Sequence, residues 1–184
     1  MPIVIGAKRE SDFMDPIGML GDCHRRIERF LNALFTVAND AKGGPLTNEQ
    51  QAALAISLRY FREAAPKHTA DEEETLFPRL RRLRRPDLQP LLAKVDSLQQ
   101  DHELAEKSHR KVDDLGRSWL ANGQLSPRDA ERLATVRRQL VELYCRHIAV
   151  EDTEVFPFAA NVLPSSDRVA MGTEMATRRG LRTP

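Results

Sequence analysis

Cysteine and aromatic side chains are scarce in this sequence. Of the 184 residues, two are cysteine and 5% are aromatic. Two cysteines are poor evidence for a disulfide framework, because reducing compartments keep thiols free. Cys23 and Cys145 directly flank two histidines of interest below, but spacings of one and two residues point them to other helix faces. We therefore expect both to be ordinary packing residues and not metal ligands.

An excess of charge of either sign is also missing. The 28 basic and 27 acidic residues leave a formal net charge of +1. A general attraction to nucleic acid or to an anionic membrane needs a strong basic excess, so we expect neither as a partner. The densest basic run, Arg79–Arg85, follows the acidic run Asp71–Glu74. This order suits a solvated helix end matched to the helix dipole.

Long hydrophobic runs are absent as well. No stretch approaches the roughly 18 consecutive apolar residues of a membrane span. The opening MPIVIGAKRE lacks the apolar centre of a secretory signal. We therefore expect a cytoplasmic protein. With 41% hydrophobic and 30% charged residues, the composition is that of a globular chain able to bury a sizeable core.

Helical periodicity runs through nearly the whole chain, and no segment shows sustained apolar and polar alternation. The spacing predicts four long helices and a short fifth: Asp15 to before Gly43, Thr47 to about Leu83, about Asp87 to Ala121, Ser126 to about Phe158, and from after Ser166 to Gly180. Within the second run, Pro66 predicts a kink or break just before His68.

Short connections between these runs favour antiparallel neighbours. The fold class is therefore predicted to be all-α, an up-down antiparallel four-helix bundle with a short extra helix at the C-terminal end. We expect the bundle over residues 12–162, a lead-in over 1–11, and the C-terminal helix and tail over 163–184.

Four of the five histidines interrupt the apolar faces of the predicted helices, one on each long helix: His24, His68, His102 and His147. A single buried imidazole is ordinarily a core residue with a hydrogen-bond partner, but its repetition on four helices indicates a shared site. Glu72 and Glu151 lie four residues after two of these histidines, so each pair projects from one helix face. A buried carboxylate needs a cation, a proton or a metal, and no lysine or arginine lies on the four main inward faces.

A duplicated motif supports the shared site. The segment from His68 to Pro78 aligns without gaps with the segment from His147 to Pro157, and His, Ala, Glu, Phe and Pro are identical. The earlier histidines repeat too, because 44 residues separate His24 from His68 and 45 separate His102 from His147. Two such hairpins about a pseudo-two-fold axis would bring four imidazoles and two carboxylates together. That set suits a pair of transition-metal ions with bridging carboxylates.

The pattern resembles the hemerythrin-like, or HHE cation-binding, domains over nearly the whole chain. The resemblance implies a non-haem di-iron centre whose ligands are His24, His68, His102 and His147, with Glu72 and Glu151 as bridges. Manganese and zinc stay open, since the same donors suit them.

Two departures from the family bear on function. Oxygen-carrying hemerythrins place a further histidine where this chain has Glu106, so the resemblance favours the members associated with sensing or repair over oxygen carriers. Those carriers also take the last carboxylate at the position of Asp152. Helix geometry favours Glu151, which lies about 40° from His147 around the helix axis, against about 140° for Asp152.

Three further side chains are candidates for an extra ligand or for a contact to a ligand. Glu106 and His109 follow His102 by four and seven residues, so either could face the cavity as an extra ligand or as a support for one. The alternatives are a solvated or rim glutamate for Glu106 and a buried or rim imidazole for His109. Tyr144, three residues before His147, either donates a hydrogen bond toward a bound oxygen species or packs with its hydroxyl at the rim.

The predicted function is that of a non-haem di-iron protein that binds or senses dioxygen, nitric oxide or peroxide. Four histidines and two bridging glutamates leave coordination positions open on both ions. The alternatives are redox turnover, such as peroxide breakdown or nitric oxide reduction, and iron sensing or donation for the repair of iron centres. Whether the protein is an enzyme stays open, and we expect a monomer or weak dimer. A metal-free interaction module would instead leave the metal content unchanged when His68 or Glu72 is replaced.

Overall fold

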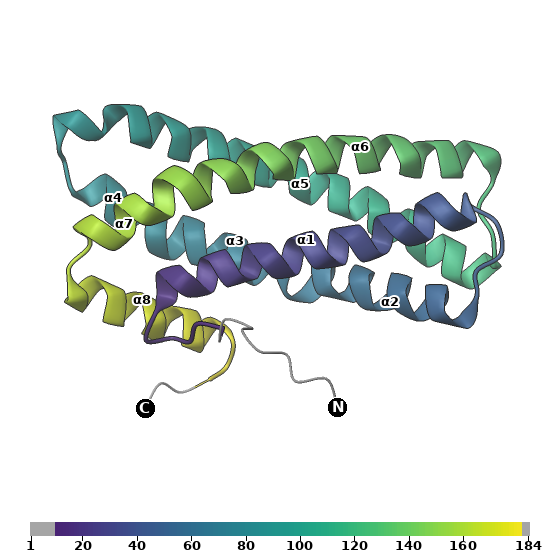
Figure 1. Ribbon diagram of the computed structural model, residues 1–184, viewed down its shortest axis with the longest axis horizontal. Coiled ribbons are helices and arrows are strands. Elements are labelled where there is room, and N and C mark those ends of the chain that lie inside the picture. Colours follow the sequence, from purple (N-terminus) through teal and green to yellow (C-terminus); the bar gives the residue numbers. More distant parts are fainter. Residues whose placement is uncertain (1–9, 182–184) are drawn as a thin grey trace, which may run out of the picture.

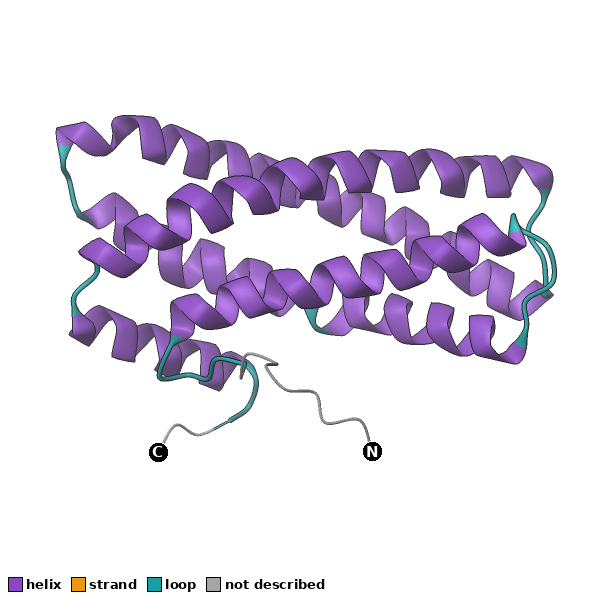
Figure 2. Cartoon of the chain, in the orientation of Figure 1, coloured by secondary structure: helices purple, strands orange, loops and turns teal. Residues whose placement is uncertain are grey.

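Helices make up almost all of residues 10–181, the part of the chain that this computed structural model describes (Figure 1). They are α1 (Pro16–Ala41), α2 (Asn48–Glu63), α3 (Ala65–Ala70), η1 (Asp71–Leu76), α4 (Phe77–Arg82), η2 (Pro86–Leu88), α5 (Gln89–Asn122), α6 (Pro127–Val150), η3 (Glu151–Val155), α7 (Phe156–Val162) and α8 (Ser165–Arg178). Short loops join them, and no strand occurs within this range (Figure 2). Most of the expected lead-in, residues 1–9, lies outside the described residues, as do residues 182–184.

The helices form four antiparallel rows. α1 packs against α2 and α6, and α5 packs against the same two helices, which closes a ring of four neighbours. The second row continues through α3, η1 and α4, and the fourth continues through η3 and α7. The predicted all-α up-down bundle is therefore confirmed. α8 lies beside one end of the bundle, against α1 and η1. Among residues 10–181, no helix is long and apolar enough to cross a membrane.

The helix starts follow from the capping residues. The Asp15 side chain accepts a hydrogen bond from the Gly18 amide at the start of α1. Thr47 and Gln50 form a complete capping box at α2, and the Ser126 side chain caps α6. Such side chains satisfy amide groups that have no partner within the first helical turn. Each long helix that carries one of these signals begins within one residue of its predicted start.

Proline and π-helical turns interrupt two of the rows. The break expected near Pro66 is present, because α2 ends at Glu63 and α3 begins at Ala65. Regular α-helix was predicted from Pro66 to about Leu83 and from Ser126 to about Phe158. Both predictions are wrong at one turn, since η1 and η3 are π-helical. Each is followed by a proline, Pro78 or Pro157, that has no amide hydrogen and clashes with the carbonyl four residues earlier in a regular α-helix. A wider turn accommodates that proline.

The core consists of two apolar clusters along the bundle axis. One is built around Trp119 and the other around Phe77, and both side chains are fully buried. On α1, His24 lies between Leu20 of the second cluster and Ile27 of the first. The histidine level of the bundle is therefore flanked on both sides by packed aliphatic and aromatic side chains.

Candidate metal centre

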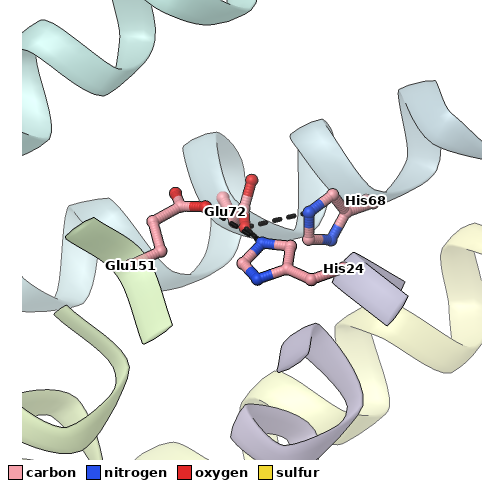
Figure 3. A group of neighbouring side chains, drawn as sticks. All are labelled: His24, His68, Glu72 and Glu151. Carbon is pink, nitrogen blue, oxygen red and sulfur yellow. Dashed lines mark ion pairs between the residues drawn. The ribbon is translucent and has the colours of Figure 1, made fainter. Parts of the chain in front are cut away.

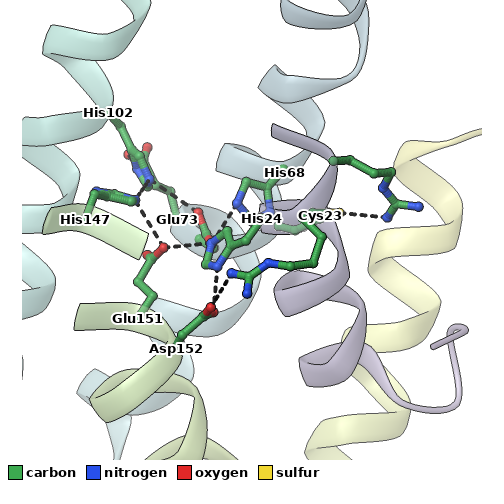
Figure 4. Close-up of polar contacts among 12 residues, drawn as sticks. Cys23, His24, His68, Glu73, His102, His147, Glu151 and Asp152 are labelled. Carbon is green, nitrogen blue, oxygen red and sulfur yellow. Dashed lines mark hydrogen bonds and ion pairs between the residues drawn. The ribbon is translucent and has the colours of Figure 1, made fainter. Parts of the chain in front are cut away.

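Six buried polar side chains meet between the two apolar clusters (Figures 3 and 4). They are His24 of α1, His68 of α3, Glu72 of η1, His102 of α5, His147 of α6 and Glu151 of η3. None of these side chains is more than 8% exposed. The structure thus brings together all six residues that the sequence places on inward faces, and each row of the bundle contributes at least one.

One group within this centre contains the two histidines of the first hairpin. His24 Nε2 lies 3.0 Å from Glu151 Oε2 and 3.7 Å from Glu72 Oε1. His68 Nε2 lies 3.2 Å from the same Glu72 oxygen (Figure 3). One possible ligand atom from each of these four residues falls within 4.8 Å of the others. The group therefore has the size of a single metal position.

The second group contains the two histidines of the second hairpin and shares both glutamates with the first. His102 Nε2 lies 3.3 Å from Glu72 Oε2, and His147 Nε2 lies 3.1 Å from Glu151 Oε2. The two imidazole nitrogens are 3.2 Å apart. Glu72 thus directs one oxygen toward each group. Two overlapping groups of this kind fit a dimetal site with shared carboxylates.

Unbalanced negative charge shows that the residues fit metal ions. Both side-chain oxygens of Glu72 and of Glu151 are buried and have no hydrogen-bond partner. Burial of an uncompensated carboxylate costs several kcal/mol, so the fold requires positive charge between them. Imidazole nitrogens and carboxylate oxygens are together a suitable donor set for iron, manganese or zinc.

The electrostatics of the metal-free protein show the same demand for positive charge. Burial by itself lowers the pKa of His24, but the hydrogen bond with Asp152 and the nearby carboxylates of Glu151 and Glu72 outweigh it and raise the pKa to about 11. Burial likewise opposes protonation of His102, yet contacts with Glu72 raise its pKa to about 9. Without a metal, protons on these imidazoles partly balance the carboxylates.

Two acidic residues orient His24 and His102 by contacting the ring nitrogen that faces away from the centre (Figure 4). His24 Nδ1 lies 2.7 Å from Asp152 Oδ1, and His102 Nδ1 lies 2.8 Å from Glu73 Oε1. A proton held at Nδ1 leaves the Nε2 lone pair directed into the centre. Each acidic residue directly follows a shared glutamate and contacts a histidine of the opposite hairpin. Sequence reasoning missed these roles, although the matched Glu73 and Asp152 of the duplicated motif were a usable signal.

The structure does not bring Glu106 or His109 into either group of ligand atoms. The Glu106 side chain is 66% exposed and pairs with Arg110. His109 Nε2 lies 2.8 Å from the Tyr144 hydroxyl, and its ring stacks on Phe61 with centroids 4.3 Å apart. His109 and Tyr144 thus form a hydrogen-bonded pair beside the centre instead of adding ligands to it.

A cavity of about 220 Å³ connects this pair to the centre. The four histidines of the centre line this cavity, and so do His109 and Tyr144. Its apolar wall residues include Ile27, Ala65 and Ile148. This volume is several times the roughly 30 Å³ that one water molecule occupies in the liquid. A small molecule can therefore lie against the edges of the histidines.

Two expectations for residues around the centre need correction. Asp71 is fully buried and Arg79 is only 7% exposed, so neither charged run is wholly solvated. The cause is α8, which covers this side of η1. Cys23 is buried as expected, but Cys145 is exposed and not packed. Neither cysteine belongs to the two groups of ligand atoms found in the described part of the chain.

Comparison with known proteins gives two matches. The family model described as the hemerythrin HHE cation binding domain matches residues 15–159, a range that contains all six residues of the centre and ends before α8. An "Uncharacterized protein" of Haemophilus influenzae is 29% identical over 173 residues, which cover 91% of this chain and 92% of that protein.

Proposed function

Because the chain belongs to the hemerythrin HHE cation-binding family and contains a buried His/Glu metal site, we propose that this site holds two iron ions and binds a small oxidant, namely dioxygen, nitric oxide or peroxide. The observation that supports two ions is the position of Glu72. Its Oε1 atom faces His68, its Oε2 atom faces His102, and neither oxygen has a hydrogen-bond partner. A carboxylate so placed is suited to bridge two ions.

The protein residues define what such a centre can bind. When bound, the iron pair would supply redox chemistry and the coordination positions that four histidines and two shared glutamates leave open. Glu73 and Asp152 fix the orientation of two histidines through their Nδ1 atoms. Apolar walls of the cavity, such as Ile27 and Ile148, limit the entry of water. Only a small ligand that reaches the histidine edges through this cavity suits the site.

Metal analysis of protein purified without air tests the proposal. We expect about two iron ions per chain and new near-ultraviolet absorption bands after exposure to oxygen. Zinc, or no metal, in protein produced with ample iron would contradict the proposal. The same iron-loaded protein is then given nitric oxide or peroxide, and continued loss of either molecule over many equivalents would assign turnover instead of binding.

The Tyr144 hydroxyl is well placed to donate a hydrogen bond to a ligand in the cavity. Burial lowers the pKa of His109 to about 4, so this imidazole carries one proton at neutral pH. Its Nδ1 atom is buried without a partner, and an unpaired buried acceptor is less costly to leave than an unpaired N–H donor. The proton therefore belongs on Nε2 and is donated to the tyrosine oxygen. The phenolic hydrogen of Tyr144 then stays available for a ligand.

Replacing Tyr144 by phenylalanine should speed ligand release without changing the metal content. Loss of one hydrogen bond costs about 1 kcal/mol, which corresponds to a release rate roughly five- to tenfold higher. The measurement is stopped-flow displacement of nitric oxide from iron-loaded protein. Tyr60→Phe is the matched control, because Tyr60 stacks on Phe30 and does not line the cavity. Equal release rates in the two variants would show that Tyr144 only packs.

A further inference from the structure

The C-terminal helix α8 is packed tightly against the row that carries Glu72. Met171 and Met175 are fully buried and belong to the apolar cluster around Phe77. At Gly172, an added Cβ atom would lie 1.9 Å from the Phe13 carbonyl oxygen, so only glycine permits this close approach. The position of α8 against the bundle is therefore closely defined by packing.

Charged contacts from α8 hold the residue directly before Glu72. Asp71 is fully buried, and its carboxylate accepts hydrogen bonds from Arg178 and from both terminal nitrogens of Arg179. Removing one partner of a buried ion pair leaves an uncompensated charge and is strongly unfavourable. The start of η1 is therefore tied to the end of α8.

A second set of contacts holds the chain just after η1. Arg79 is 7% exposed and donates two hydrogen bonds to the Glu174 carboxylate, over 2.9 and 2.6 Å. It also donates to the carbonyl oxygen of Thr75, inside η1, over 2.8 Å. Bidentate pairs of this kind fix geometry as well as adding energy. The π-helical turn that presents Glu72 is thus held at both ends by α8.

Within residues 10–181, the other half of the duplicated motif has no charged contact of this kind with α8. In the gap-free alignment of the two segments, extended by one residue past the second proline, Asp71 corresponds to Val150 and Arg79 to Phe158. Neither replacement carries charge, and α8 packs chiefly against α1 and η1. Those two elements carry His24 and Glu72, two of the four residues in the first group, but only one residue of the second group.

We propose that α8 is a clamp that positions Glu72 and makes the two metal positions unequal. Arg178, Arg179 and Asp71 are positioning residues, and the ion at the His24 and His68 position is held firmly only while α8 is docked. The proposal rests on the proposed function in that the centre must hold two ions. It adds that α8, which lies outside the residues matched by the family model, determines how firmly one of the two ions is held.

Release of cobalt(II) to an excess of chelator tests the clamp on the full chain. In the double variant Arg178→Gln/Arg179→Gln, we expect one of the two ions to leave at least tenfold faster than from the unsubstituted protein. The other ion, which shares Glu72 but takes no ligand from α1, should be accelerated much less. Arg178→Lys/Arg179→Lys, which keeps both charges, should restore most of the difference. Arg62→Gln, which removes a distant pair with Asp113, should change neither rate.

A further variant identifies which ion is affected. Glu73→Gln replaces the charged partner of His102 in the second group by a neutral amide, so combining it with the double arginine variant should speed the release of both ions. Equal acceleration of both ions by the arginine variant alone, or no acceleration, would overturn the clamp. If the double variant does not fold by circular dichroism, Asp71→Asn gives the same test with little change of shape. Unsubstituted protein that binds no cobalt or iron would refute the proposed function itself.

Discussion

Replacing Glu72 by glutamine should remove both metal ions from the protein and not just one. The two carboxylate oxygens face different histidines, with Oε1 3.2 Å from His68 Nε2 and Oε2 3.3 Å from His102 Nε2. Glutamine offers one oxygen and no charge, so it cannot serve both positions. Changes to residues that merely support a ligand reduce metal affinity by about 10- to 100-fold. Loss of a shared ligand should exceed that range and leave near-zero occupancy after dialysis.

The next two residues provide controls of the same chemistry. Glu73→Gln replaces the charged hydrogen-bond partner of His102 Nδ1 by a neutral amide oxygen and should weaken metal binding without abolishing it. Glu74 is 68% exposed and pairs only at the surface with Arg178, so Glu74→Gln should keep both ions. Metal content per chain is measured for all three variants after identical dialysis. Retention of two ions by the Glu72 variant would refute a shared carboxylate, and loss of one ion would assign it to a single position.

The candidate ligands could be predicted because amphipathic periodicity defines which face of each helix is buried. His24 and His102 occupy positions where an apolar residue belongs, and the structure buries both side chains at the centre. The choice of Glu151 over Asp152 also follows from periodicity, because in a regular α-helix the angle between two residues is determined by their separation. The structure directs Glu151 inward and places Asp152 on the Nδ1 side of His24.

The features that periodicity could not reveal are local changes of helix type and contacts between residues far apart in the sequence. A π-helical turn changes the number of residues per turn over only five or six residues, which a period read over a whole helix does not detect, so η1 and η3 were not predicted. The roles of Glu73 and Asp152 need partners 29 and 128 residues away along the chain. Burial of Asp71 depends on Arg178 and Arg179 in a helix more than a hundred residues later. Such side-chain pairs depend on how the helices pack, and a single sequence read by itself does not specify that packing.

The metal-free protein should lose stability as the pH rises above about 6.5. Burial alone lowers the pKa of His24 and of His102, but nearby carboxylates raise these values to about 11 and about 9. A raised folded-state pKa adds stability that is complete below the unfolded value of about 6.5. That stability is lost as the pH rises through the folded-state values. Between pH 6.5 and 9 the free energy of unfolding should fall by at least about 1 kcal/mol per pH unit.

In acid two further histidines, His68 and His109, act in the opposite direction. Burial lowers the pKa of His68 and of His109 to about 4. The unfolded chain then binds more protons than the folded protein below pH 6.5, so stability falls as the pH drops toward 4. The metal-free protein should therefore be most stable near pH 6.5. His109→Gln removes one acid-side contribution and should leave the alkaline decline unchanged, which makes it the matched control.

Metal binding should reverse the alkaline part of this profile, because the ions take the place of the protons. Nitrogen ligands must be deprotonated, so each displaced proton makes apparent binding about tenfold tighter per pH unit. Metal-induced stabilisation grows with affinity, so the gap between the loaded and metal-free proteins should widen from pH 6.5 to 9. Chemical unfolding with and without chelator measures both curves. A metal-free protein that becomes more stable over this range would show that its imidazoles are neutral and that the carboxylates are balanced in another way.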